Sequence, residues 1–307
     1  MSRDNDRSWL VDSIGAAAFE QLATGLPGSA LQSVLLEVMH QRAAARAPKD
    51  LVAQYARDGF VAPALVDLRT SLAVDTQLFA TASDFEAIEL SPVAPLGASS
   101  SVAVTDQHRV LSALRATEVV SDPTNVLALE CARRLRTDRT ACLRLATSQR
   151  VLRAQPVPKQ AGFTPHFRMF VLASAGQETR EHAFTVQAVV NHMQTLLAGL
   201  DALERSGYAF GARRIDILAT PERSQVADRI AASVSGDVTR KLLEHPYYSG
   251  GLRFQIWATA ADGSELPLAD GGSFDWLVKL AADRRAVYVA SGLGTQLVAL
   301  RFARAQH

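Results

Sequence analysis

The 307-residue sequence is poor in cysteine, with only Cys131 and Cys142. Two thiols are too few for a disulfide framework or a cysteine-based zinc site, and so low a content is typical of a reducing cytosol. The sequence also lacks any run of the roughly 20 apolar residues that a membrane span needs. Its charged N-terminus is not followed by the apolar stretch of a signal peptide. These absences predict a cytoplasmic protein that does not enter a membrane.

An excess of charge of one sign is lacking as well, because 32 Lys and Arg face 31 Asp and Glu, a formal net charge of +1. Such a balance gives no overall field that attracts nucleic acid or an anionic membrane. Apolar residues, by contrast, make up 48% of the chain. This composition and length predict a globular protein of one large domain or two small ones.

Helical spacing of apolar residues marks the N-terminal part of the chain. It predicts helix from Ser8 to Arg46 with a break at Pro27-Gly28, and a further helix from Pro48 to Arg57. A short strand, Phe60 to Ala62, is expected next. We therefore divide the chain into an N-terminal helical segment, residues 1–50, and a core domain, residues 51–307.

The remaining chain alternates between segments of helical and of β character. Residues 64–113 mix short β-like runs with turns, and Leu90–Ser101 has the composition of a loop or lid. Periodicity predicts helices at Asn125–Arg136, Glu181–Ser206 and Ser224–Leu243, the last interrupted at Ser235-Gly236, and strands at Arg214–Ala219 and Leu252–Thr259.

Histidines give no sign of a metal site. His182 and His192 lie ten residues apart on one predicted helix, so they cannot share a zinc ion as residues four apart do. We interpret both as surface histidines and expect no bound metal.

Residues 148–176 consist of two β-prone runs around a segment punctuated by prolines and glycine. This pattern predicts an antiparallel hairpin with a long, stiff tip. Arg150 and Arg153 on its first strand could bind a phosphate or a carboxylate, since guanidinium groups bind both bidentately. The alternative is an edge hairpin whose charges are only solvated.

The same hairpin carries a family resemblance. Gln160-Ala-Gly162, followed by Phe167, Met169-Phe170 and Gly176, resembles without a gap the second signature motif of histidyl-tRNA synthetases and of their paralogue, the regulatory subunit of ATP phosphoribosyltransferase. Arg153 falls on the phosphate-binding arginine of that motif. Phe163 and Pro165 replace two further arginines, and His166 replaces a glutamate. The resemblance implies that the hairpin is retained while much of its chemistry is lost.

A second element of the resemblance precedes the helix expected at Asn125. Asp122 and Thr124 fall on the acidic and hydroxyl positions with which the family holds the α-ammonium group of its substrate. A carboxylate and a hydroxyl can fix an ammonium by charge-assisted hydrogen bonds. The alternative is that either residue only caps the helix.

Further resemblance lies in the last third of the chain and near residue 60. Pro246-Tyr-Tyr-Ser-Gly250 resembles the Asp-Tyr-Tyr-Thr-Gly element of the family, and Asp270–Leu277 resembles its Gly-Gly-Arg-Tyr-Asp element. Val287–Leu297 resembles the third motif, with Leu297 in place of the arginine that clamps the ATP phosphates. The helix followed by Gly59-Phe60 and Pro63 resembles the first motif, which implies a homodimer built on this segment.

Taken together, the resemblance implies an α/β (α+β) protein with the class II synthetase-like fold, a mixed, mainly antiparallel sheet flanked by helices. Adenylation needs cations and Mg²⁺ around the reacting phosphate. Because the arginines are replaced, we expect no ATP or Mg²⁺ cofactor and no aminoacylation. The chain ends ten residues after Leu297, so no anticodon-binding domain and no tRNA partner are expected.

Two functions remain open at this point. The first is a catalytically degenerate regulatory subunit that binds a partner protein, such as the catalytic subunit of ATP phosphoribosyltransferase in histidine biosynthesis. The second is an enzyme whose rebuilt pocket acts on an amino acid or another small amine. For either, the expected ligand-binding residues are Asp122, Thr124, Arg153, His166, Tyr247 and Tyr248.

Overall fold

The computed structural model describes residues 9, 11–158, 160 and 162–303. Its centre is an eight-stranded sheet in the order β1-β5-β6-β11-β10-β9-β7-β8. The strands are β1 (Glu86–Ala87), β5 (Leu143–Leu152), β6 (His166–Gln177), β7 (Arg213–Ala219), β8 (Val238–Leu242), β9 (Leu252–Thr259), β10 (Glu265–Phe274) and β11 (Ala286–Gly294). Neighbours from β5 to β7 pair antiparallel, and only the edge strands β1 and β8 pair parallel. The predicted mixed, mainly antiparallel sheet is therefore confirmed.

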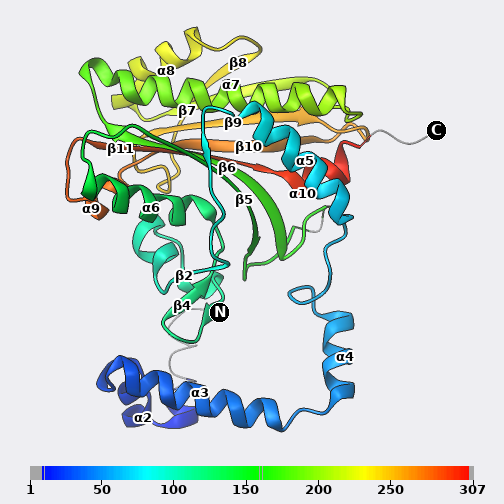
Figure 1. Cartoon of the computed structure of the whole chain (residues 1–307), viewed down its shortest axis with the longest axis vertical. Helices are drawn as coiled ribbons and strands as arrows, with labels where there is room; N and C mark the ends of the chain where they lie inside the picture. The colour runs from blue at the N-terminus through cyan, green and yellow to red at the C-terminus, as the bar shows by residue number, and fades with distance from the viewer. Residues whose placement is uncertain (1–8, 10, 159, 161, 304–307) are drawn as a thin grey trace.

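Helices cover both faces of this sheet (Figure 1). One face carries α5 (Leu68–Thr81), α7 (Ala183–Arg205), α8 (Ser224–Ala232) and α10 (Thr295–Arg301), and the other carries α6 (Pro123–Thr137) and α9 (Trp276–Leu280). A small sheet in the order β2-β4-β3, formed by β2 (Val93–Pro95), β3 (Ser112–Ala113) and β4 (Thr117–Val119), lies beyond α6.

The long helix α7 forms because its apolar residues recur at three- and four-residue spacing, which places them on one face. Met193, Leu196 and Leu200 on this face are fully buried against the sheet. On the opposite face Leu127 and Cys131 of α6 pack with Trp276 of α9 in a second core. The predicted helices at Asn125–Arg136 and Glu181–Ser206 and the predicted hairpin are confirmed, with small changes of boundary.

The N-terminal helices lie apart from the sheet (Figure 1). They are α2 (Ala16–Glu20), α3 (Gly28–Ala44) and α4 (Pro48–Arg57), and no residue in them is buried. The predicted helices and the break at Pro27-Gly28 are thus confirmed from Ala16 onward, while Ser8 lies outside the described residues. The apolar side chains of α3 and α4 face solvent in the single chain.

Three predictions of secondary structure were wrong in whole or in part. Residues 60–62 form a turn, because Asp58 accepts hydrogen bonds from the amides of Phe60, Val61 and Ala62 and so leaves no strand edge. Residues 64–113 contain the short strands β1, β2 and β3, as expected, but also the helix α5, which was missed and is capped by the Asp67 carboxylate. The final part of the predicted helix at Ser224–Leu243 is the strand β8, since Gly236 has a positive φ and residues 238–242 pair with β7.

The segment Leu90–Ser101, predicted as a loop or lid, contains β2 and the beginning of a π-helical turn, Ala98–Val102. The buried carboxylate of Glu118 in β4 holds it, accepting hydrogen bonds of 2.8 Å from the Gly97 and Ser99 amides. A carboxylate that accepts several amide hydrogen bonds is stabilised in its charged form. These hydrogen bonds therefore hold the segment in a defined conformation against β4.

Candidate functional site

Two adjoining cavities open on the sheet face that carries α6 and α9. The polar chamber, about 620 Å³, lies next to the N-terminus of α6, and the apolar chamber, about 330 Å³, lies next to the N-terminus of α10. Both are lined by Arg153, Gln155, Met169, Asp270 and Gly292, so they meet along this seam. Beyond this seam the two chambers are lined by residues of different chemistry.

Asp122 lies at the N-cap of α6 and faces the polar chamber. Its Oδ1 accepts hydrogen bonds from the amide of Thr124 (3.0 Å) and from the Thr124 hydroxyl (2.8 Å). Its Oδ2 accepts one from the Tyr247 hydroxyl (3.2 Å) and lies 3.6 Å from Nη2 of Arg153. Asp122 therefore caps the helix and also belongs to a cluster of side chains in the cavity.

Burial raises the pKa of Tyr247 well above its ordinary value, and the neighbouring charge of Asp122 raises it further. The phenol therefore stays protonated and donates to the carboxylate at physiological pH. Arg153 is also fixed by a 3.0 Å hydrogen bond to the Ser121 carbonyl and by the ring of Phe167, 5.1 Å away. The structure thus brings Asp122, Thr124, Arg153 and Tyr247 together.

A second pair of opposite charges lies across the cavity. Arg253 of β9 donates from Nε to Asp270 of β10 (3.1 Å) and from Nη2 to the other carboxylate oxygen (2.5 Å). The Tyr248 hydroxyl donates to the same carboxylate at 2.6 Å, and burial, followed by the charge of Asp270, raises the pKa of Tyr248. Tyr247 thus donates a hydrogen bond to the aspartate of the Asp122–Arg153 pair. The next residue, Tyr248, donates one to the aspartate of the Asp270–Arg253 pair.

The second pair was not predicted from the sequence. Arg253 appeared only as one position of an alternating strand, and Asp270 only as the residue before a Gly-Gly step. Arg253 pairs with Gly272 across the two strands, so the bridge to Asp270 is diagonal and depends on the register. The pattern that could have revealed this pair is the alternation of apolar and polar residues along β9, which places Arg253 and Gln255 on the same face of the strand.

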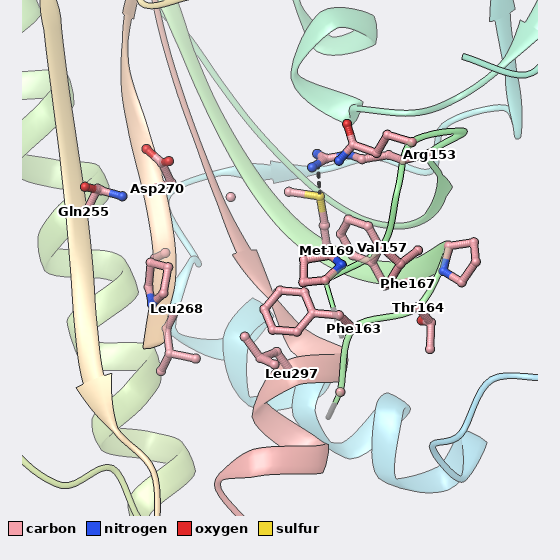
Figure 2. Close-up of a pocket in the computed structure, with 18 of the residues that line it drawn as sticks. Arg153, Val157, Phe163, Thr164, Phe167, Met169, Gln255, Leu268, Asp270 and Leu297 are labelled. Carbon is pink, nitrogen blue, oxygen red and sulfur yellow. Dashed lines mark hydrogen bonds between the residues drawn. The ribbon is translucent and has the colours of Figure 1, made fainter. Parts of the chain in front are cut away.

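The apolar chamber (Figure 2) is lined by the residues that stand where the family motifs have arginine side chains. Phe163, Pro165 and Leu297, the replacements for three arginines, all line it. Gly162 has a positive φ of 93°, and a Cβ there would lie 3.1 Å from Cδ1 of Leu297, so the hairpin tip packs closely on α10. Ala161, part of the same motif, lies outside the described residues.

Arg301, one helical turn beyond Leu297, does not line either chamber. Its Nη2 is 2.6 Å from Oδ2 of Asp262 and 2.7 Å from the Ser264 hydroxyl. Its guanidinium is thus engaged at the loop between β9 and β10. It does not replace the cation that is missing at Leu297.

His166 lines neither chamber, unlike the other expected ligand-binding residues. Its Nε2 is 2.8 Å from the Ala62 carbonyl, and its Nδ1 is 3.0 Å from Nη1 of Arg150. Since a carbonyl can only accept, Nε2 donates and Nδ1 accepts from the arginine. In this structure His166 connects the segment after α4 to the hairpin.

His192 is fully buried, so its interpretation as a surface histidine was wrong. It lies on α7 between the hydroxyls of Ser174 in β6 and Ser291 in β11, each at 2.9 Å. Burial and, to a smaller extent, the positive charge of Arg144 lower its pKa to about 3. The ring is therefore neutral and links the helix to two strands. His182, in contrast, is exposed.

Within the ranges that the structure describes, no group of three or more His, Cys, Asp or Glu side chains could hold a metal ion. No helix among the same residues has the length and hydropathy to cross a membrane.

No protein-family model matches the chain, and no curated protein matches it by sequence. Solved structures do match. An ATP phosphoribosyltransferase regulatory subunit/histidyl-tRNA synthetase from Bacillus halodurans has 15% identity and a TM-score of 0.56, covering 75% of this chain and 78% of its own. The apo histidyl-tRNA synthetase of S. aureus has 10% identity and a TM-score of 0.59, covering 78% and 68%.

A histidine–tRNA ligase subunit from Alicyclobacillus acidocaldarius also matches, with 14% identity and a TM-score of 0.57 over 78% of this chain and 96% of its own. At such identities the likeness concerns the fold. The fold of the chain therefore agrees with the resemblance predicted from the motifs. The chain has the class II synthetase-like fold shared by histidyl-tRNA synthetases and the ATP phosphoribosyltransferase regulatory subunit.

Proposed function

We propose that this chain is a catalytically degenerate, histidyl-tRNA synthetase-like protein that acts as a regulatory, partner-binding subunit. The observation that carries the proposal is the apolar wall formed by Phe163, Pro165 and Leu297, where aminoacylation would require arginines. Removing one group that stabilises a transition-state charge typically costs about 10²–10³-fold in rate. Three such losses leave no useful rate of adenylation.

The two arginines that line the apolar chamber do not compensate for these losses. Arg153 and Arg253 are both paired with aspartates, so neither offers an uncompensated positive charge to a triphosphate. A triphosphate in the apolar chamber would lie beside side chains that cannot replace its water shell, which is costly. We therefore propose that neither ATP nor Mg²⁺ is a cofactor of this protein.

The partner is proposed from the neighbours of the fold. One of them is named an ATP phosphoribosyltransferase regulatory subunit/histidyl-tRNA synthetase, and we propose by analogy that this chain binds the catalytic subunit of an ATP phosphoribosyltransferase in histidine biosynthesis. Fold alone does not fix function, so the proposal depends on direct tests of binding. A cytoplasmic homodimer without tRNA as a partner is part of the same proposal.

The test combines ligand and partner binding. Thermal unfolding should show no stabilisation by Mg-ATP up to millimolar concentration, and pyrophosphate exchange with histidine should stay at background. Purified protein should form a complex of defined mass with a short-form ATP phosphoribosyltransferase from the same source. Stabilisation by ATP, or exchange above background, would support instead the enzyme with a rebuilt pocket.

A further inference from the structure

The apolar chamber has the size and lining of a small-molecule site. Its volume of about 330 Å³ lies within the range of ligand pockets, roughly 300–1,000 Å³. Its wall is formed by hydrophobic and aromatic side chains together with prolines. Phe163, Leu268, Leu297 and Met169 line it from the hairpin tip, β10, α10 and β6, and Figure 2 shows Phe163 next to Leu297 and the Met169 sulfur directed toward Arg153.

The charges that reach this chamber are already balanced. Among the described residues its charged lining consists of Arg153, Arg253 and Asp270. Arg253 binds Asp270 through two nitrogens, and Arg153 lies 3.6 Å from Asp122. Burying a charge without a partner is costly, so an additional ligand charge would be disfavoured here.

One polar side chain in the wall is suited to an uncharged partner. The amide of Gln255, on β9, lies at the cavity (Figure 2), and within the described part of the chain the structure shows no hydrogen bond from it to another residue. A primary amide both donates and accepts hydrogen bonds. It can therefore bind a hydroxyl, an amine N–H or an amide without requiring an ionic charge.

We infer that the apolar chamber binds an uncharged, mainly apolar small molecule with a ring or branched body and one hydrogen-bonding group at Gln255. The inference deepens the proposed function, because it rests on the loss of the ATP site and names what that space now holds. Such a ligand would be the molecule that the regulatory subunit senses. It would neither resemble a nucleotide nor need Mg²⁺.

A matched pair of probes tests the charge preference. N-phenyl-1-naphthylamine is uncharged and carries one N–H, while 8-anilino-1-naphthalenesulfonate has the same aromatic body with an added sulfonate. The uncharged probe should bind with a stoichiometry of one per chain and with an affinity roughly tenfold or more above that of the sulfonate. Equal or tighter binding of the sulfonate would overturn the inference.

Variants locate the bound probe. Leu297→Arg places a charge in the chamber and should weaken binding of N-phenyl-1-naphthylamine by roughly tenfold or more. Leu242→Arg, at an exposed position of β8 outside the chamber, should leave the affinity unchanged. Circular dichroism checks that each variant folds, and Phe163→Ala, on a surface loop, serves as a second chamber variant with an expected loss of affinity.

The outcomes distinguish binding of the probe in the apolar chamber from binding elsewhere on the protein. Loss with both chamber variants and retention with Leu242→Arg supports the inference. Retention with both chamber variants places the probe elsewhere, for example on the exposed helices α3 and α4, and overturns it. Absence of both probe and ATP binding overturns this inference alone, whereas binding of Mg-ATP overturns the proposed function whatever the probe does.

Discussion

At the residue scale, the two oxygens of Asp122 have different partners. Oδ1 caps α6, and Oδ2 contacts Tyr247 and Arg153. The sequence motif implied that this carboxylate binds an ammonium group. In the free chain Arg153 lies at that place, so an amine ligand would compete with it for the carboxylate.

We predict that Asp122→Asn weakens the binding of an amine or amino acid in the polar chamber by about 1–3 kcal/mol, the usual contribution of a charged hydrogen bond. Asparagine is also a good N-cap, so the helix should keep its stability. Titration calorimetry with a panel of amino acids measures the change. Asp138→Asn, at the exposed end of α6 and remote from both chambers, is the control. Unchanged affinity would remove Asp122 from the site.

The two cysteines differ in environment and should differ in reactivity. Cys131 is fully buried in α6, and burial raises the pKa of its thiol to about 12, whereas Cys142 is exposed. Since the thiolate is the reactive form, the native protein should react with one equivalent of Ellman's reagent and the unfolded protein with two. Cys142→Ser should abolish the native reaction. Two fast equivalents in the native state would contradict the packing of α6.

At the scale of elements, His192 joins α7 to β6 and β11, and its buried ring remains neutral well below its ordinary pKa of 6.5. Between pH 6.5 and about 3 the unfolded chain binds a proton that the folded chain does not. Stability should therefore fall as pH falls through this window, with a slope of up to about 1.4 kcal/mol per pH unit from this group.

Urea unfolding at pH 7.5 and pH 5.0 measures this effect. His192→Gln keeps a polar side chain of similar length without the titrating ring, so its loss of stability between the two pH values should be smaller. His182→Gln removes an exposed histidine and is the matched control. Equal pH dependence in wild type and His192→Gln would show that this ring does not bind an extra proton on unfolding.

The helix α7 was predictable because most of its buried residues are apolar and follow the helical period. The helix α5 was not, since its buried face includes Ser71 and Asp75. Asp75 is tolerated there because Arg168 and Ser148, which are remote in sequence, donate to it at 2.6 and 2.8 Å. A buried polar network therefore hides the amphipathic pattern until the tertiary structure is known.

The candidate site, too, was predicted only in part from the sequence. Motifs with fixed spacing along the chain placed Asp122, Thr124, Arg153, Tyr247 and Tyr248 near one cavity, and their ligand roles remain predictions. The bridge between Arg253 and Asp270 was missed, because it depends on how β9 and β10 are paired. The position of His166 was missed too, since it is determined by Ala62, a residue more than a hundred positions away.

At the scale of the whole molecule, the segment from α3 to the start of α5 exposes a series of large apolar side chains. They include Val52 at 70% exposure and Tyr55 at 53%, both on α4, and Phe60 and Val61 in the following turn. Monomeric proteins rarely leave such side chains together in water. This exposure agrees with the homodimer that the first-motif resemblance implies for the Gly59–Pro63 region.

We predict that the protein has twice its chain mass of 33.0 kDa by light scattering at micromolar concentration. The double variant Val52→Asp/Tyr55→Asp should be monomeric, because two buried carboxylates without partners would oppose association. Leu242→Asp, an exposed apolar residue on β8, should remain dimeric. A monomeric wild type would count directly against an interface at this segment.

The adjacent tyrosines of the cavity have a mechanical consequence. Tyr247 holds the carboxylate at the start of α6 and Tyr248 holds the carboxylate on β10, and the amide of Gly250 ties their turn to the Ser273 carbonyl. A displacement of this turn would therefore move both hydrogen bonds together. Ligands in the two chambers need not touch for the affinity of one to depend on occupancy by the other, and such linkage is necessarily reciprocal.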